Sequence, residues 1–312
     1  MEKTAIGVDI GGTKVKLGVV SKTGKLINRS VIENTPRSPV ECMKRIVSAV
    51  SSLLRTVDGR HKNISGIGIA VAGDIDCRNG VVRFSPNLGW RNVEIRRYFK
   101  GHFKTDVFVE NDANAAAWGI YCVELKRKLK NVVCITLGTG VGGGLVIDGR
   151  LYRGSTGSAG EIGHVSLFPD GEKCNCGNYG CVERYIGRDG ILKKFLSRLS
   201  ADKRASADIK SITPETIARA AKSGDKISIE TFRETGEQLG VFACSIANIF
   251  NPDVIAFTGG ISRNGDILFG PMKRIFAKRC GLTRKKTRFY VSKQPENIGI
   301  IGSACLVFVP HS

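Results

Sequence analysis

Apolar residues recur along the chain with two periods, one typical of buried strands and the other of amphipathic helices. Short runs rich in Val and Ile and bounded by Gly, Asn or Asp predict strands at 4–9, 15–20, 26–33, 64–71, 107–110, 131–137, 145–148 and 254–258. Apolar positions three or four residues apart predict helices at 39–57, 113–127, 188–199, 213–222, 225–250 and from about 298. This alternation of strands and helices predicts an α/β fold.

The same order of elements occurs twice. In each half a strand, a glycine loop and a returning strand come first, and helices and strands alternate after them. A repeat of this kind predicts two similar α/β domains that face each other across a cleft. No low-complexity linker separates the halves, so we expect the boundary near 115–130 to be a helix and not a flexible tether.

The two glycine loops are candidate phosphate sites. Backbone N–H groups in such loops can surround an anion, because no side chain blocks the approach. Neither loop matches a P-loop or a dinucleotide fingerprint, and a single loop is more often a tight hairpin. Two loops at the same point of a repeat favour a phosphate chain that both contact. The candidate residues are Gly11, Gly12, Thr13 and Lys14 in the first loop, and Gly138, Thr139 and Gly140 within 138–144 in the second.

Two further positions are candidates for the chemistry of that site. Asp9 comes directly before the first glycine loop, where a carboxylate can hold Mg²⁺ through water. Asn111 and Asp112 follow a predicted strand and begin a helix. Residues of these types often cap helices, which is one interpretation. The other is ligand binding, because the carboxyl ends of strands in α/β sheets are where ligands bind.

Four potential metal ligands gather in one stretch: His164, Cys174, Cys176 and Cys181. One imidazole and three thiolates fill the four positions of a closed, structural zinc site. Gly177 and Gly180 allow the tight turns that aim several thiolates at one point. Unliganded cysteines and a disulfide are the alternatives, but three thiols rarely crowd in this way without a metal. Nothing marks the chain as secreted, which argues against a disulfide. We therefore predict structural zinc.

Composition narrows the class of protein. The 312 residues are enough for two domains, and no apolar run reaches transmembrane length. No signal peptide precedes the first predicted strand, so we expect a cytoplasmic protein without a membrane partner. The net charge of +20 raises the question of nucleic-acid binding. The basic runs at 126–128 and 284–286 contain no aromatic residue to stack on bases, so we expect no nucleic-acid partner and interpret the charge as a solvated surface that attracts anionic nucleotides.

Several stretches together resemble the ROK family, which contains bacterial sugar kinases and sugar-responsive repressors and belongs to the actin, Hsp70 and sugar kinase superfamily. They are DIGGTK at 9–14, ENDANA at 110–115, GTGVGGG at 138–144, EIGH at 161–164 and CNCGNYGCVE at 174–183. The last stretch is the family's specific signature, and the similarity runs from 9 to 302. FSPNLGW at 84–90 further resembles the glucokinase branch.

The resemblance implies a fold of two duplicated actin/hexokinase-like (RNase H-like) domains with a central cleft. The smaller domain would comprise 1–115 and, through the final helix, about 298–312. The larger would comprise 116–297 and carry the zinc site. Family members often carry Pro-Gly at the sugar loop, whereas this chain has Ala72-Gly73 and so lacks the rigid proline.

The resemblance also implies residue roles. Asp112 would be the general base, and Asn111 would hold sugar hydroxyls. The implied sugar contacts are completed by Gly73, Asn87, Glu161, His164 and Glu183. The implied nucleotide contacts are Asp9, Gly11, Gly12, Thr13, Lys14, Gly138, Thr139, Gly140, Gly259 and Gly260, of which the last two would lie against the adenosine.

These roles predict a glucokinase that uses ATP and Mg²⁺ to phosphorylate the glucose 6-hydroxyl. An N-acetylmannosamine or N-acetylglucosamine kinase is the nearest alternative, because it shares every catalytic motif. A sugar-responsive repressor would carry a helix-turn-helix domain ahead of the first glycine loop, and only eight residues precede Asp9 here. Polyphosphate stays open as a second donor, and similar proteins imply a homodimer.

Overall fold

The computed structural model describes residues 2–56, 64–201, 208, 211–281 and 287–309. The basic run at 284–286 therefore lies outside the described residues. The chain divides into two compact units, which are described separately. Unit 1 comprises Met1–Lys130, Gly144–Gly160 and Ser292–Ser312, and unit 2 comprises Asn131–Gly143 and Glu161–Val291. The expected domain boundary after residue 115 stays a prediction.

Unit 1 is built on a five-stranded sheet in the order β3-β2-β1-β4-β8. The strands are β1 Thr4–Ile10, β2 Lys14–Ser21, β3 Leu26–Glu33, β4 Ile64–Val71 and β8 Val107–Asn111. β1, β2 and β3 pair antiparallel, whereas β1, β4 and β8 run parallel. The carboxyl ends of these three parallel strands therefore lie at one edge of the sheet, which is where ligands bind in α/β folds.

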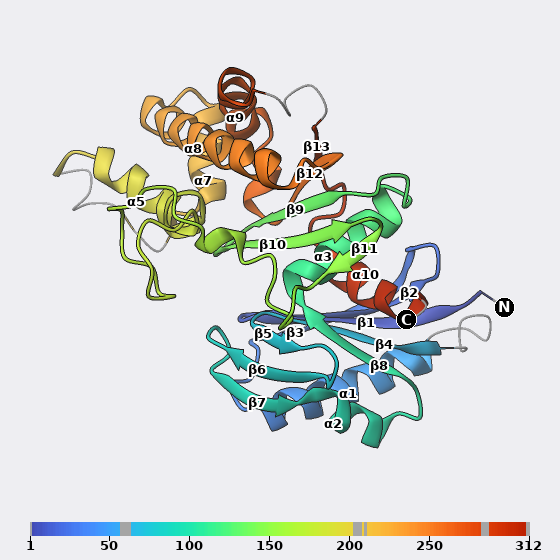
Figure 1. Cartoon of the computed structure of the whole chain (residues 1–312). Coiled ribbons are helices and arrows are strands. Elements are labelled where there is room, and N and C mark those ends of the chain that lie inside the picture. The colour runs from blue at the N-terminus through green and yellow to red at the C-terminus, as the bar shows by residue number, and fades with distance from the viewer. Residues whose placement is uncertain (1, 57–63, 202–207, 209–210, 282–286, 310–312) are drawn as a thin grey trace. The chain divides into compact units, whose positions relative to one another are not determined.

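Helices cover both faces of this sheet (Figure 1). α1 Pro39–Thr56 and α2 Ile95–His102 pack on one face, where their apolar residues share a core with Ile6 and Val8. α10 Ile298–Cys305 packs on the other face. That contact needs glycine in β4, because a Cβ at Gly68 would lie 1.8 Å from the Ser303 carbonyl oxygen. α10 therefore sits directly on the sheet backbone.

Several parts of unit 1 differ from the sequence prediction, and α2 is one of them, because no helix was predicted at 95–102. An antiparallel sheet of β5 Asp74–Asp76, β6 Val81–Ser85 and β7 Trp90–Glu94 was not expected, and it carries the FSPNLGW stretch. The helix expected from 113 to about 127 begins one residue earlier and ends three residues earlier than predicted. α3 spans Asp112–Gly119 and continues as a π-helical turn, Ile120–Glu124. Lys126 and Arg127 then adopt left-handed backbone angles, with φ of 53° and 55°, which no helix can contain.

The second sheet has the order β11-β10-β9-β12-β13. Its strands are β9 Val132–Leu137, β10 Val141–Ile147, β11 Arg150–Tyr152, β12 Val254–Thr258 and β13 Arg288–Val291. Counted along the chain, both sheets have the third strand at one edge, then the second, first, fourth and fifth. The predicted duplication is confirmed by this shared order.

The returning strand was predicted at 145–148 but begins at Val141, so the glycine loop ends at Gly140 and not at Gly144. Gly144 lets β10 pack closely against α3, since a Cβ there would lie 2.6 Å from the Ala113 carbonyl oxygen. Glycine in a strand often marks such a close approach of another backbone.

The helices of unit 2 are α4 Glu183–Ile186, α5 Arg188–Arg198, α7 Pro214–Lys222, α8 Lys226–Phe250 and α9 Asp266–Arg279. α9 was not predicted, because it contains Gly270 and Pro271, and both residues argue against a helix interior. Among the described residues, no helix has the length and apolar character that a membrane crossing requires.

Candidate functional site

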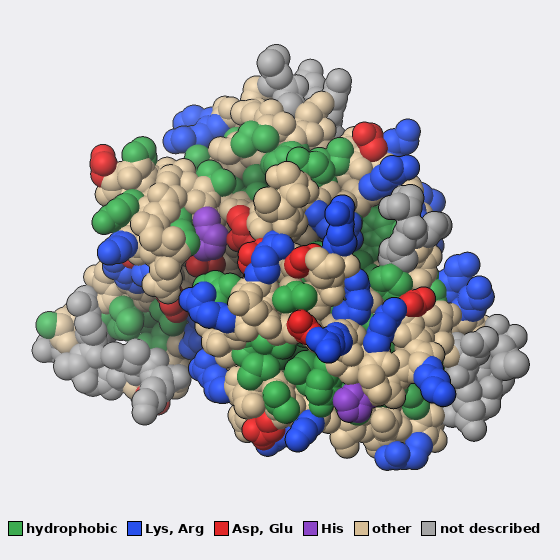
Figure 2. Space-filling view, turned by 60° about the horizontal axis from the view of Figure 1, so that its bottom comes forward, with side chains coloured by type: hydrophobic (Ala, Val, Ile, Leu, Met, Phe, Trp, Pro, Cys, Tyr) green, Lys and Arg blue, Asp and Glu red, His purple; other side chains and the backbone are tan. Residues whose placement is uncertain are grey.

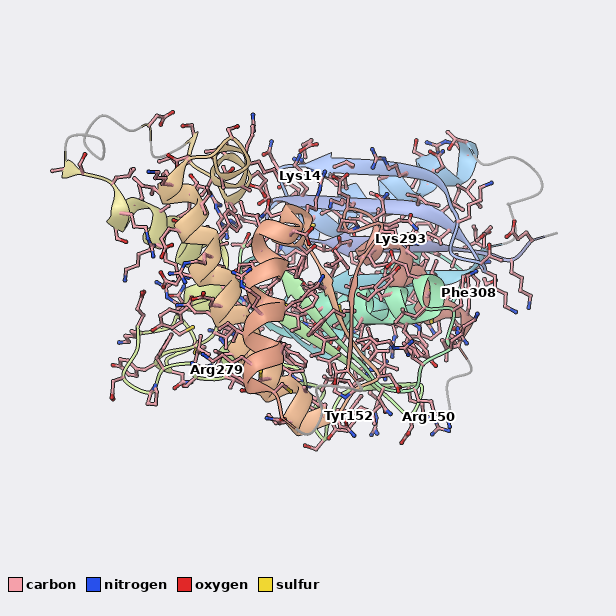
Figure 3. All side chains as sticks on the ribbon, turned by 90° about the horizontal axis from the view of Figure 1, so that it is seen from above. Lys14, Arg150, Tyr152, Arg279, Lys293 and Phe308 are labelled. Carbon is pink, nitrogen blue, oxygen red and sulfur yellow. The ribbon has the colours of Figure 1, made fainter. Side chains whose placement is uncertain are left out.

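The first glycine loop is a tight turn between β1 and β2. The Gly11 amide donates to the Lys14 carbonyl oxygen at 3.0 Å, and the Thr35 hydroxyl donates to the Gly11 carbonyl oxygen at 2.8 Å. Gly12, Thr13 and Lys14 are exposed. Lys14, labelled in Figure 3, pairs with Glu33, with 2.8 Å between Nζ and Oε2. Lys14 is a predicted phosphate contact, and in this structure its positive charge is paired with the Glu33 carboxylate.

Of the two neighbouring candidates Asn111 and Asp112, Asn111 is the helix cap. The cap of α3 is Asn111, whose Oδ1 accepts from the amides of Ala113 at 2.9 Å and Asn114 at 3.1 Å. Asp112 is the first residue of the helix, and its Oδ1 also accepts from the Ala113 amide at 2.9 Å. Because Asn111 supplies the cap, Asp112 is not needed for it. Burial raises the pKa of the Asp112 carboxyl above its ordinary value.

Asp9 lies close enough to Asp112 for the two charges to interact. Burial, with the negative charge of Asp112 adding to it, raises the pKa of Asp9 to about 6, while Lys16 opposes the shift. Asp9 also lies against the first turn of α10, since a Cβ at Gly299 would be 2.5 Å from the Asp9 Oδ2 atom. Two carboxylates that repel each other in a half-buried place form a site that a cation stabilises.

The predicted sugar loop of unit 1 is anchored by Asn111. Its Nδ2 donates to the Gly73 carbonyl oxygen at 3.1 Å. Gly73 has a φ of 132°, and a Cβ there would lie 2.4 Å from the Phe84 carbonyl oxygen, so only glycine fits. Asn111 therefore holds the loop that lacks the usual proline at position 72.

Asn87 lies in the turn between β6 and β7. Arg37 donates from Nη1 to the Asn87 carbonyl oxygen at 3.2 Å, and the buried Trp90 ring donates to the Arg37 carbonyl oxygen at 3.0 Å. The Asn87 Cβ lies 3.5 Å from where a Cβ on Gly12 would be. The structure thus places this sugar candidate beside the first glycine loop.

In unit 2 the second glycine loop contacts Glu183. The Gly138 amide donates to the Gly140 carbonyl oxygen at 3.0 Å, which closes the turn. Glu183, the first residue of α4, accepts at Oε2 from the Val141 amide at 3.0 Å. A Cβ on Gly140 would lie 2.2 Å from the same oxygen. A predicted nucleotide loop and a predicted sugar residue are therefore joined by a hydrogen bond.

The four predicted metal ligands converge. The ligand atoms of His164, Cys174, Cys176 and Cys181 all lie within 4.8 Å of one another. The His164 Nδ1 is 3.7 Å from the Cys174 Sγ, and the same distance separates the sulfurs of Cys176 and Cys181. Zinc–sulfur bonds of ~2.3 Å in a tetrahedron require ligand atoms on the order of 3.8 Å apart, so the set fits zinc. The other ring nitrogen, Nε2, is 3.8 Å from the Glu161 Oε2 atom.

Local turns bring these thiols together. Gly177 and Gly180 have φ of 95° and 68°, which other residues rarely adopt. A Cβ at Gly180 would lie 1.6 Å from the Phe168 carbonyl oxygen. The Cys174 amide donates to the Asn178 carbonyl oxygen at 2.8 Å, which closes the turn around Cys176. Glycine is thus required for the thiols to face one point.

Gly259 and Gly260 follow β12, which lies beside β9 in the second sheet. Gly259 has a φ of 92°, and a Cβ there would lie 2.3 Å from the Leu137 carbonyl oxygen. Leu137 ends β9 and leads into the second glycine loop, so the two glycine segments share one edge of the sheet. A hollow of about 310 Å³ near this edge is lined by Phe257, Ser262, Arg263, Gly265, Asp266, Phe269, Lys273, Phe289 and Val291.

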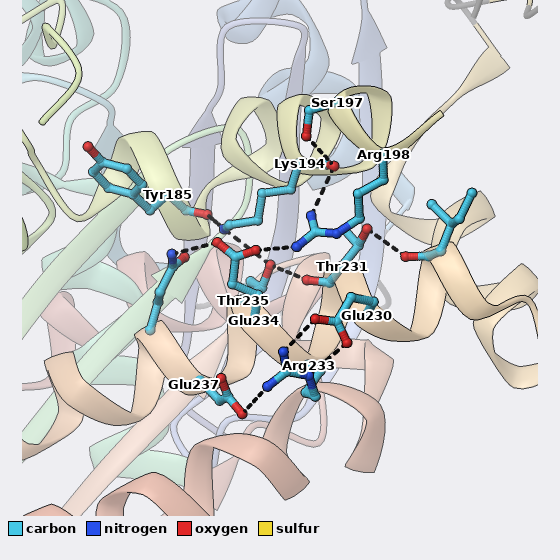
Figure 4. A network of polar contacts seen from close by, with 12 residues as sticks. Tyr185, Lys194, Ser197, Arg198, Glu230, Thr231, Arg233, Glu234, Thr235 and Glu237 are labelled. Carbon is cyan, nitrogen blue, oxygen red and sulfur yellow. Dashed lines mark hydrogen bonds and ion pairs between the residues drawn. The ribbon is translucent and has the colours of Figure 1, made fainter. Parts of the chain in front are cut away.

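A polar network that joins α4, α5 and α8 was missed by the sequence analysis (Figure 4). Lys194 of α5 donates from Nζ to the Tyr185 carbonyl oxygen of α4 and to the Thr235 hydroxyl of α8, the latter at 3.4 Å. Burial lowers the pKa of Lys194 to about 8, while the nearby Glu234 opposes the shift and Arg198 adds to it. A lysine with a charged neighbour on a helix gives no sequence signal of such burial.

Lys and Arg side chains are spread over the face of the molecule shown in Figure 2 and do not form a single stripe there. The formal net charge of +20 is therefore not concentrated on this face as a nucleic-acid groove requires.

Comparison with known proteins gives consistent matches along the chain. A sequence model described as the ROK family matches residues 5–309. A glucokinase from Streptomyces coelicolor is 33% identical over 98% of both chains. A xylose repressor from Caldicellulosiruptor bescii is 28% identical over 97% of this chain and 77% of its own.

Solved structures agree with these matches. The crystal structure of a ROK family glucokinase from Streptomyces griseus, in complex with glucose and AMPPNP, superposes with a TM-score of 0.84. It is 32% identical and covers 97% of this chain and 98% of its own. The expected fold, with two actin/hexokinase-like α/β domains, is confirmed.

Proposed function

The chain belongs to the ROK family, and from this premise we propose that it is a sugar kinase that transfers a phosphoryl group from ATP to the 6-hydroxyl of glucose. Curated relatives named glucokinase support the proposal, as does the similar structure that contains glucose and AMPPNP. The FSPNLGW stretch is the part of this chain that favours glucose.

The observation that carries the proposal is the placement of Asp112. Its carboxylate lies at the carboxyl end of β8, and Asn111 has taken over the cap of α3. Burial raises the pKa of Asp112 and makes the carboxylate a better proton acceptor than an exposed aspartate. Phosphoryl transfer to a hydroxyl needs that hydroxyl oriented and its proton accepted. Asp112 would supply both.

The remaining sugar contacts are the ones that the resemblance to the family implies. Asn111 would hold sugar hydroxyls together with Gly73 and Asn87. Glu161, His164 and Glu183 would bind further hydroxyls, and the His164 Nε2 and Glu161 Oε2 atoms lie 3.8 Å apart, so one sugar could reach both. Several hydrogen-bonding groups of this kind let a site reject sugars that lack a matching hydroxyl.

The nucleotide would bind at the glycine segments. Backbone amides of 11–14 and 138–140 would contact its phosphates, and Gly259 and Gly260 would lie against the adenosine. Asp9 would hold Mg²⁺ through water, and the half-buried pair of Asp9 and Asp112, whose negative charges interact, fits a cation. Bound Mg²⁺ neutralises charge on the phosphates.

Zinc would be structural. His164, Cys174, Cys176 and Cys181 would fill all four positions, so the metal would take no direct part in the reaction. His164 would then present Nε2 toward Glu161, which ties the metal site to the proposed sugar contacts.

The test is an assay of sugar-phosphate formation with glucose, mannose, fructose, N-acetylglucosamine and N-acetylmannosamine, each with ATP and with polyphosphate as donor. We expect the highest kcat/KM for glucose with ATP. A preference for either acetylated sugar would replace glucose but leave a sugar kinase. Sugar binding in calorimetry without turnover of any sugar would overturn the enzyme assignment and favour a regulator. The homodimer stays a prediction.

A further inference from the structure

Glu110 of β8 is a buried carboxylate directly before Asn111 and Asp112. Only 1% of its surface is exposed. A charge removed from water in this way is tolerated only when donors and an opposite charge surround it. The proposed reaction gives Glu110 no task, because neither the sugar nor the nucleotide contacts include it.

Four donors surround the Glu110 carboxylate. Its Oε1 accepts from the Asn111 amide at 3.0 Å, from the Asn114 Nδ2 at 3.1 Å and from the Cys77 thiol at 3.2 Å. Its Oε2 accepts from the Arg153 Nε at 2.7 Å. Burial, with the charge of Glu110 adding to it, raises the pKa of Cys77 to about 12, so the thiol keeps its proton and donates.

These bonds hold the turn from β8 into α3. Glu110 binds the backbone of Asn111 and the side chain of Asn114, and Asn111 binds the amide of Asn114. The proposed base, Asp112, lies between these anchored residues. A shift of the turn would move its carboxylate away from the hydroxyl, and misplacement by ~1 Å is enough to cost on the order of 10²-fold in rate.

Arg153 is the anchor that comes from elsewhere in unit 1. It follows β11 and lies 43 residues beyond Glu110 in the chain. Its side chain is 40% exposed, so water can reach the guanidinium although the carboxylate is buried. Arg153 thus neutralises Glu110 from the side of the solvent and fixes the direction in which the carboxylate points.

We propose that Arg153 is a positioning residue for the reaction: through Glu110 it sets the β8–α3 turn and with it the place of Asp112. Arg153 itself is not among the proposed sugar or nucleotide contacts. The inference rests on the proposed function for its kinetic consequence, but the effect on the turn is independent of it.

Arg96 provides a matched control. It donates from Nε to the Val107 carbonyl oxygen at 2.9 Å, at the start of β8, and from Nη2 to the Cys77 carbonyl oxygen at 2.7 Å. Arg153 and Arg96 therefore both bind β8, one at the end that carries Asp112 and the other at the opposite end. Arg96→Met removes bonds to the backbone of β8 and of Cys77 but leaves all four donors on Glu110, so it should destabilise the unit without moving the turn.

The experiment compares Arg153→Met, Arg96→Met and the double variant Glu110→Gln/Arg153→Met with the wild type. We expect kcat of Arg153→Met to fall by ~10²-fold, as for a misplaced base, with the KM for ATP within about threefold. Arg96→Met should lose melting temperature but keep kcat. The double variant carries no unpaired buried charge, so it should melt above Arg153→Met, with kcat still lowered by about tenfold or more because the anchor is missing.

Hydrogen exchange separates this inference from the proposed function. Amides of 111–114 should exchange faster in Arg153→Met than in the wild type and should be unchanged in Arg96→Met. A wild type without kinase activity would refute the proposed function but leave this readout. Unchanged exchange, or a kcat within about threefold of wild type, would overturn the positioning role. So would an equal loss of kcat in Arg96→Met. If Arg153→Met does not fold, the exchange of amides 111–114 and the kcat are measured in Glu110→Gln/Arg153→Met instead, and unchanged values there overturn the positioning role.

Discussion

Replacing Asp112 by Asn separates catalysis from helix capping. Asparagine has almost the same shape and keeps an oxygen that can accept from the Ala113 amide. It cannot take a proton from a sugar hydroxyl. The true cap, Asn111, is untouched in this variant. The substitution therefore removes the proposed base and little else.

The effect on turnover follows from the loss of proton transfer. General base catalysis contributes ~10²- to 10⁴-fold, which corresponds to about 2.7–5.4 kcal/mol of transition-state stabilisation. We expect kcat of Asp112→Asn to fall by at least the lower figure. The acid limb of the wild-type pH profile should lie above the ordinary aspartate pKa, because burial raises the pKa of Asp112. Activity is lost as pH falls through that raised pKa.

Asp112→Asn lowers turnover, but it should not lower the stability of the fold. A carboxyl whose pKa is raised on folding favours the protonated state, so stability falls as pH rises through the window between the unfolded and folded pKa values. Above that window the full cost of the buried charge is present. Asp112→Asn removes this cost, so its melting temperature at pH 7.5 should equal or exceed that of the wild type.

Asn111→Ala is the control. It loses the acceptor for the amides of Ala113 and Asn114, which costs ~1 kcal/mol. For a chain of this size that is a fall of about 2–4 °C in melting temperature. Steady-state kinetics with glucose and ATP, together with thermal melts, measure both effects. Asp112→Asn with more than about a tenth of the wild-type kcat, well above the range for a lost base, would refute the reasoning.

Three further predictions follow from the packing and the polar groups. Cys176→Ser should lower zinc from one ion per chain and reduce the melting temperature, as elemental analysis and thermal melts can check; full activity in zinc-free protein would contradict it. Gly302→Ala should destabilise by ~1–3 kcal/mol in denaturant melts, because a Cβ there would lie 1.8 Å from the Ala115 carbonyl oxygen; an unchanged midpoint would show that α10 can shift. Lys194 has its pKa lowered from 10.5 to about 8, so the unfolded state binds more protons between these values. The stability of wild type relative to Lys194→Met should therefore rise across that window, by up to ~3 kcal/mol, and a flat difference would argue against burial of the amine.

The sequence by itself determined the elements and sites that depend on neighbours along the chain. The metal ligands lie within 18 residues, and Gly177 and Gly180 supply the turns that aim them, so the cluster was predictable. Strands such as β12 had the predicted bounds, because an apolar run between turn residues is a local pattern. The repeated order of elements is also a pattern along the chain, so it predicted the duplicated fold.

Only the tertiary structure decided how groups distant in sequence share their bonds. The sequence left open whether Asn111 and Asp112 cap a helix or bind a ligand, and only the structure assigned the cap to Asn111. Glu33 takes up the charge of Lys14, and Arg153 reaches Glu110 across 43 residues. No periodicity or spacing encodes these pairs, because the strands and helices that carry them meet only when their apolar faces are buried together.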